Sequence, residues 1–131
     1  MAVLVYSPSG GSAGGTDAGV QLQNAQTGNA DSTNVADRAL LQGGGGVLIT
    51  SAIGATPTVT VNLLGSLDGA TFFNVPYSLV ATPRTFVLTA ITITTAVTTL
   101  YILQELIPWR FFKVNMSANT NVTLTTFFWS R

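Results

Sequence analysis

The chain is 131 residues long, a length typical of one domain, and 47% of its residues are hydrophobic. Only ten residues are charged, five basic and five acidic, whereas about a quarter of an average soluble domain is charged. With zero net charge, no histidine and no cysteine, the chain lacks a basic surface for nucleic acid, the usual catalytic bases and nucleophiles, and thiolate metal ligands. Such a weakly charged surface suits packing against other copies or a larger scaffold, so we expect an assembly component and not an enzyme.

Residues 1–46 are rich in glycine and poor in apolar side chains. They hold ten of the thirteen glycines and only one aromatic residue, Tyr6. Because so little can be buried, this part is not expected to build a core of its own. It is either a flexible leader or an extended arm that becomes ordered on a neighbouring subunit, and we favour the arm. Met1 to Tyr6 reads as mature sequence that can add a strand to another sheet, which makes Val3, Val5 and Tyr6 candidate interface residues.

Residues 47–131 are predicted to form a β-sandwich domain. Apolar and polar side chains alternate with a period of two, and Gly, Pro, Asp and Asn separate the runs. Asp68-Gly69 is a strong signal for a tight turn between two strands. In the first part of the chain, Val35 to Gln42 is predicted to form either a short strand or a helical turn. The expected strands of the domain are Val47 to Ile53, Thr58 to Leu64, Ala70 to Val75, Arg84 to Thr94, Val97 to Gln104, Trp109 to Met116 and Asn121 to Trp129.

This spacing indicates an all-β fold, an antiparallel β-sandwich or small barrel. One stretch, Thr85 to Gln104, has no formal charge over a length that could span a bilayer. Seven of its residues are threonine and its pattern alternates, so we expect strands there and no membrane span.

Several strands carry apolar side chains on both faces, although only one face of a strand points into its own core. In the predicted strand Trp109 to Met116, alternation places Phe112, Val114 and Met116 on one face and Trp109, Phe111 and Lys113 on the other. We expect the surplus aromatic residues to be covered by the arm or by another subunit. Arg110 and Lys113 are candidate ion-pair partners of Glu105 or of an acid on a neighbour. The candidate interface residues here are Trp109, Arg110, Phe111, Lys113, Phe127 and Trp129.

The sequence offers little for catalysis or metal binding. Three of the five acids lie in residues 1–46, so Asp68 and Glu105 are the remaining pair for a carboxylate mechanism, and Asp68 is most simply a turn residue. No acidic loop has calcium-ligand spacing. We therefore predict no catalytic residue, no metal ligand and no cofactor.

Two segments resemble a pattern found in small virion proteins of tailed bacteriophages. These are Val59 to Phe72, with Ser-Leu-Asp-Gly followed by an aromatic residue, and Trp109 to Thr120, which begins aromatic-Arg-aromatic-aromatic-basic-Val. The resemblance, over roughly residues 57 to 126, is to capsid cement or decoration proteins. It implies a jelly-roll-like sandwich on the capsid exterior, bound to the major capsid protein at joints in the shell and associated with copies of itself as a dimer or trimer. No nucleic acid or membrane is expected as a partner.

Two other functions stay open at this point. One is a different virion role, such as a tail or fibre component. The other is a carbohydrate-binding module that uses Trp109, Trp129 or Tyr77 as a stacking platform.

Overall fold

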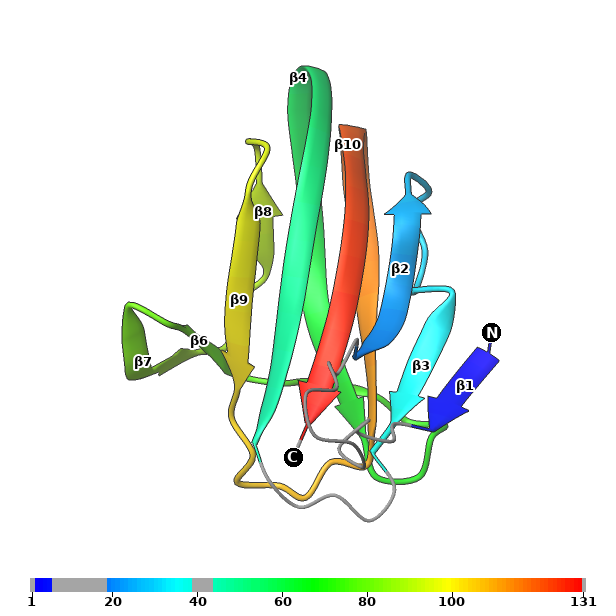
Figure 1. Ribbon diagram of the computed structural model, residues 1–131, viewed down its shortest axis with the longest axis vertical. Coiled ribbons are helices and arrows are strands. Elements are labelled where there is room, and N and C mark those ends of the chain that lie inside the picture. Colours follow the sequence, from blue (N-terminus) through cyan, green and yellow to red (C-terminus); the bar gives the residue numbers. More distant parts are fainter. Residues whose placement is uncertain (1, 6–18, 39–43, 131) are drawn as a thin grey trace, which may run out of the picture.

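The computed structural model describes residues 2–5, 19–38 and 44–130. These residues form ten β-strands and no helix, which confirms the all-β prediction (Figure 1). No helix that could cross a membrane is found in this part of the chain. The strands are β1 (Ala2–Val5), β2 (Val20–Gln26), β3 (Asn34–Asp37), β4 (Gly45–Ser66), β5 (Phe73–Asn74), β6 (Tyr77–Leu79), β7 (Thr82–Val87), β8 (Ile91–Ile93), β9 (Thr98–Leu103) and β10 (Phe111–Ser130).

Two long antiparallel strands, β4 and β10, organise the fold. They pair with each other along almost their whole length, and both fold over at the top of the molecule in Figure 1. Each therefore contributes one half to each of two layers. The front layer contains β9, residues 45–53 of β4, residues 122–130 of β10, and β2. The back layer contains β8, residues 58–66 of β4, residues 111–117 of β10, β3 and β1.

The fold-over joins strands that the sequence divides. Val47 to Ile53 and Thr58 to Leu64 are two halves of β4. Most of Trp109 to Met116 and all of Asn121 to Trp129 belong to β10, and the residues between them form a bend within that strand. Three residues at the bends have positive φ angles: Thr56 at 49°, Ala118 at 51° and Asn121 at 53°. The Asn121 side chain ties the two bends together, because its Nδ2 donates to the Ala55 carbonyl at 2.6 Å.

The core lies between the two layers and is built from the side chains that alternate inward. Phe112 of the back layer stacks on Phe128 of the front layer, with 5.0 Å between ring centroids. Phe112, Val114 and Met116 are all buried, so the shared face predicted for them is confirmed. The predicted turn at Asp68-Gly69 is also confirmed: Gly69 has a φ of 80°, and β4 and β5 on either side of the turn pair antiparallel.

The division near residue 46 does not hold for the described part of the first segment. Val20, Leu22 and Ala36 belong to the hydrophobic core, and β2 and β3 pair with β10. Residues 20–37 therefore contribute to the core of the sandwich and do not build one of their own. The predicted glycine-rich arm falls largely on residues 6–18 and 39–43, outside the described residues.

Candidate functional site

The aromatic and basic segment that begins at Trp109 is divided between core and surface. Trp109 is only 5% exposed and packs near the Phe73 ring, with 6.1 Å between centroids. A Cβ atom on Gly65 would lie 2.9 Å from the indole, which shows how closely the backbone approaches it. Trp109 therefore does not share a face with Phe111 and Lys113, as alternation predicted, because this side chain is a core residue of its own chain.

Arg110 and Phe111 lie on the outer face of the back layer. The Arg110 guanidinium stacks over the Phe111 ring at 5.0 Å and binds both carboxylate oxygens of Asp37, at 2.8 and 3.0 Å. The hydrogen bonds and charge of Asp37 raise the pKa of Arg110. This bidentate pair fastens β3 to the start of β10.

Lys113, like Arg110, pairs with an acid of its own chain and lies over an aromatic ring. Its Nζ binds Asp31 Oδ2 at 2.7 Å and lies 4.0 Å from the centroid of the Phe72 ring. Asn115 Nδ2 donates to the other oxygen of Asp31 at 2.9 Å. Burial acts to raise the pKa of Asp31, but the bonds from Lys113 and Asn115 and the charge of Lys113 leave it below its ordinary value.

The predicted pairing of Arg110 or Lys113 with Glu105 is wrong, because Glu105 pairs with Arg38. Burial raises the pKa of Glu105 against the opposing attraction of Arg38 and a hydrogen bond from the Gly45 backbone. The sequence could not reveal these partners, because each ion pair joins residues 67 to 82 positions apart.

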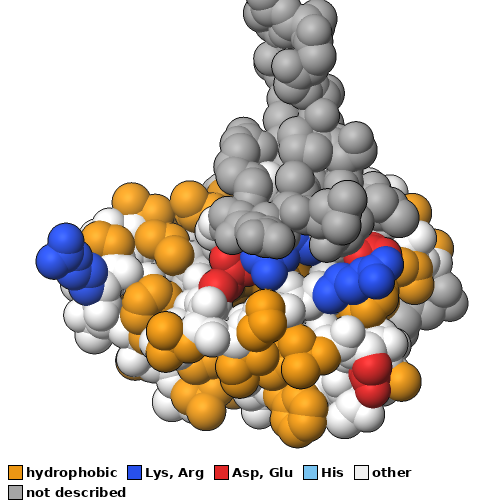
Figure 2. All heavy atoms as spheres, turned by 90° about the horizontal axis from the view of Figure 1, so that it is seen from below, with side chains coloured by type: hydrophobic (Ala, Val, Ile, Leu, Met, Phe, Trp, Pro, Cys, Tyr) orange, Lys and Arg blue, Asp and Glu red, His pale blue; other side chains and the backbone are white. Residues whose placement is uncertain are grey.

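The ion pairs use most of the charge in the described residues. Asp31, Asp37, Arg38, Glu105, Arg110 and Lys113 are paired within the chain. Within residues 2–5, 19–38 and 44–130, Arg84 and Asp68 are the charged side chains without an ion-pair partner. Asp68 Oδ1 instead accepts bonds from Ala70 N and Thr71 N, at 2.9 and 2.8 Å, and from the Ser66 hydroxyl. These bonds lower the pKa of Asp68. In the view from below, the charged side chains occupy a small part of the surface beside many hydrophobic ones (Figure 2).

The outer face of the front layer carries no charged residue in its central rows. Cross-strand partners share a face of a sheet, so the pairing defines these rows. Leu48 lies between Leu100 and Phe127, Gly46 between Ile102 and Trp129, and Thr50 between Thr98 and Thr125. We call these nine residues the front face. Its apolar end contains Phe127 and Trp129, two of the predicted interface residues, whose rings lie 5.8 Å apart.

A shallow apolar groove of about 380 Å³ lies at that end of the front face. Its lining residues are Gly44, Gly46, Leu48, Leu100, Trp129 and Ser130. Glycine at position 46 keeps the floor low, because a Cβ atom there would approach the Leu100 side chain to 3.3 Å.

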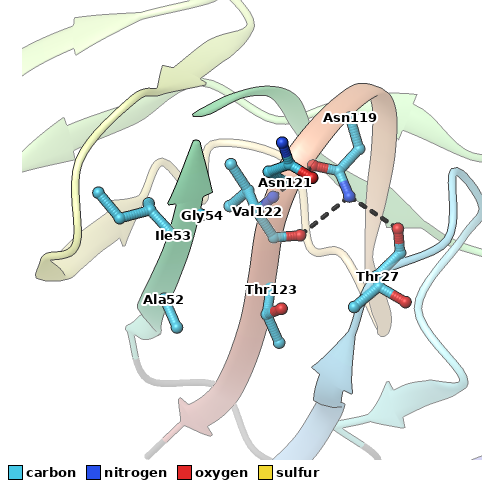
Figure 3. Close-up of a pocket in the computed structure, with 8 residues that line it drawn as sticks. All are labelled: Thr27, Ala52, Ile53, Gly54, Asn119, Asn121, Val122 and Thr123. Atoms are coloured by element: carbon cyan, nitrogen blue, oxygen red, sulfur yellow. Dashed lines mark hydrogen bonds between the residues drawn. The ribbon is translucent and has the colours of Figure 1, made fainter. Parts of the chain in front are cut away.

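A second, polar hollow of about 480 Å³ lies where β4 and β10 fold over (Figure 3). Its polar side chains come from Thr27, Asn119, Asn121 and Thr123, and it contains no aromatic or charged residue. The amide of Asn119 is committed to the fold, since Nδ2 donates to the carbonyls of Thr27 and Val122 and Oδ1 accepts from Val122 N. This hollow is mainly the inner side of the bend.

The first strand pairs within its own chain. β1 runs parallel to β3, with Val3 opposite Val35 and Val5 opposite Asp37, so in this chain it already has a sheet to join. Val3 is 54% exposed. Tyr6 lies outside the described residues. Of this predicted interface, the structure therefore describes Val3 and the backbone of Val5.

Asp68 and Glu105, the acids left for a carboxylate pair, have separate structural roles in the turn after β4 and in the pair with Arg38. Across the described ranges, no three His, Cys, Asp or Glu side chains gather in a way that could hold a metal ion.

Comparisons with protein families, with curated proteins and with solved structures found no match to this chain.

Proposed function

We propose that this protein is a structural component of a virion: a cement protein that binds the outside of the shell at joints between major capsid proteins and stabilises it. The observation that supports this most is the front face. It presents Leu48, Leu100, Phe127 and Trp129 together with threonines and no charged residue. The three ion pairs of the described residues each join two residues of this chain.

The size of this surface favours a lattice partner. Its nine residues lie on three strands about 4.8 Å apart and span five positions at about 3.4 Å each, which gives a face of roughly 240 Å². A standard stable interface buries about 800 Å² on each partner. One such contact is weak alone, but it becomes strong when repeated over a shell whose joints are bridged by many copies.

The rival carbohydrate-binding function now depends on Trp129 and the groove beside it. Trp109 is in the core and cannot stack on a sugar without unfolding its surroundings. The groove has a single aromatic wall, Trp129, and its other side chains are Leu48, Leu100 and Ser130. Few polar groups are therefore available to orient a sugar's hydroxyls.

The proposal is tested by sedimenting purified shells with the parent protein and with a variant that carries Leu48→Glu and Leu100→Glu. Placing charge in the middle of the face should reduce the bound fraction at least tenfold, because an unpaired charge buried in an interface is costly. Thr60→Glu, on the outer side of the back layer, is the matched control and should bind like the parent. Equal binding by the double variant, or a parent that ignores the shells, would refute the proposal; glycan binding by the parent, lost in Trp129→Ala, would favour the rival.

The arm belongs to the same proposal and needs its own experiment. Removing residues 1 to 15 should weaken attachment to shells while leaving the sandwich folded. Unchanged attachment would remove the arm from the mechanism without affecting the role of the front face.

A further inference from the structure

The two ends of the strand order are both open and differ from each other. The order runs from β1 through β3, β10, β4, β9 and β6 to β7, so β1 and β7 each have one edge without a partner strand among the described residues. Figure 1 shows β7 and β1 on opposite sides of the lower part of the molecule. Open edges and exposed apolar side chains invite association with another chain.

At the β7 end, the β6–β7 hairpin projects from the body (Figure 1); β6 pairs with β9, and β7 pairs with β6. Four of its apolar residues are 40 to 61% exposed: Leu79, Val80, Val87 and Leu88. β7 is the last strand of the order and has a strand partner on one side only, so a partner chain at its open edge would stabilise it. We call Leu79, Val80, Val87 and Leu88, together with Arg84 of β7, the hairpin patch.

At the other end, the loop after β4 folds over β10 toward β3 and β1. Gly69 lies against the Phe111 ring, and Phe72 lies beneath Lys113. Leu67 in this loop is 55% exposed and Val3 of β1 is 54% exposed. We call Leu67, Asp68 and Val3, three exposed residues toward this end of the strand order, the loop patch. The turn bonds to Oδ1 hold the Asp68 carboxylate outward and leave Oδ2 for a partner.

Each patch therefore carries one of the two described charges that lack an ion-pair partner, and the charges have opposite sign. A two-fold contact through either patch would bring like charges together, whereas a head-to-tail contact would pair Arg84 of one copy with Asp68 of the next. We propose that copies of this chain associate head to tail, with the hairpin patch of one copy against the loop patch of the next. The apolar side chains provide the affinity and the charge pair sets the direction. Such a contact closes as a ring or extends as a filament, and it does not depend on the shell.

The test uses two variants of the full chain. The hairpin variant carries Val80→Glu and Arg84→Glu; the loop variant carries Leu67→Lys and Asp68→Asn, and the asparagine keeps the oxygen that accepts the turn bonds. In size-exclusion chromatography with light scattering, the parent should form oligomers and each variant alone should be a monomer. An equimolar mixture should form a one-to-one dimer and nothing larger, because it contains one intact contact.

The mixed dimer is the result that a symmetric interface cannot produce. A monomeric mixture, variants that stay oligomeric, or a parent that is monomeric at millimolar concentration would overturn the proposal. The milder pair Arg84→Gln and Asp68→Asn guards against misfolding. Each should weaken association by about two- to fivefold, the range expected for an exposed ion pair. Circular dichroism should show an unchanged β-sheet signal in all variants.

Discussion

The two tryptophans provide a sharp test, because the sequence treats them alike and the structure does not. Trp109 is 5% exposed within the core, whereas Trp129 is only partly buried and packs beside Phe127 on the front face. Replacing a buried Trp by Ala typically costs about 3 to 5 kcal/mol, since it removes apolar burial and leaves a cavity. The cavity at Trp109 should not collapse fully, because Phe73 and the Gly65 backbone are held by the pairing of β4 and β5.

We therefore expect Trp109→Ala to lower the free energy of unfolding by about 3 to 5 kcal/mol, a large share of a typical domain's stability. Trp129→Ala should cost about half as much or less and should reduce shell attachment instead. Urea unfolding followed by circular dichroism measures the first effect. The chain has two tryptophans, so each variant's fluorescence then reports on the other one alone. Equal losses of stability in the two variants would refute the assignment of Trp109 to the core and Trp129 to the surface.

Three further substitutions test the fold. Gly65→Ala should lower stability by about 1 to 3 kcal/mol in urea unfolding, because its Cβ atom would lie 2.8 Å from Val75 Cγ2; Gly28→Ala, with nothing within 4 Å, is the control. Thr56→Gly should raise the free energy of unfolding by about 1 kcal/mol, since a β-branched residue at a φ of 49° is strained. A lower free energy of unfolding would mean that the bend needs the threonine side chain. Asp31 has a lowered pKa in the folded chain, so its stabilising effect is present above its unfolded pKa and is lost as the pH falls through the folded value. Asp31→Asn should therefore flatten the pH dependence of stability below about pH 5. An unchanged acid slope in this variant would contradict the argument.

The part of the fold that was predictable is the part set by alternation. Val59, Val61 and Leu63 alternate with polar residues, and all three are buried as that pattern requires. The strand β2 was missed because its sequence, Val20–Gln26, is mostly polar. Gln23 is nevertheless buried there, and the Thr126 hydroxyl donates to its Oε1 at 2.6 Å. A buried hydrogen-bonded pair of this kind depends on the register of β2 and β10 and leaves no periodic signal.

The bends were harder to predict for a conformational reason. Positive φ angles usually occur at glycine, or at asparagine and aspartate. Asn121 follows that preference, but Thr56 and Ala118 do not, so the sequence reads as four short strands where two long ones fold over. The interface residues were only partly predictable for a similar reason: Trp109 precedes the first residue of β10, Phe111, so strand alternation does not govern its direction.

The distribution of charge leads to a last prediction about salt. If association relied on charge, raising the ionic strength would dissociate the oligomer strongly, since exposed ion pairs are screened beyond a Debye length of about 10 Å at 0.1 M. Here the proposed head-to-tail contact contains one ion pair, Arg84 with Asp68, among apolar side chains. We expect the dissociation constant of the oligomer to rise no more than about fivefold between 0.05 and 1 M sodium chloride, the limit set by one exposed pair.

The apolar part of the same contact should respond in the opposite direction. Sulfate, which is excluded from protein surfaces, strengthens apolar burial, so sodium sulfate should tighten the oligomer where sodium chloride loosens it slightly. Arg84→Gln is the matched control: it should remove the chloride sensitivity and keep the response to sulfate. Light scattering across both salt series measures this directly. A loss of association of several hundredfold in chloride would show that charges outside the hairpin and loop patches hold the copies together.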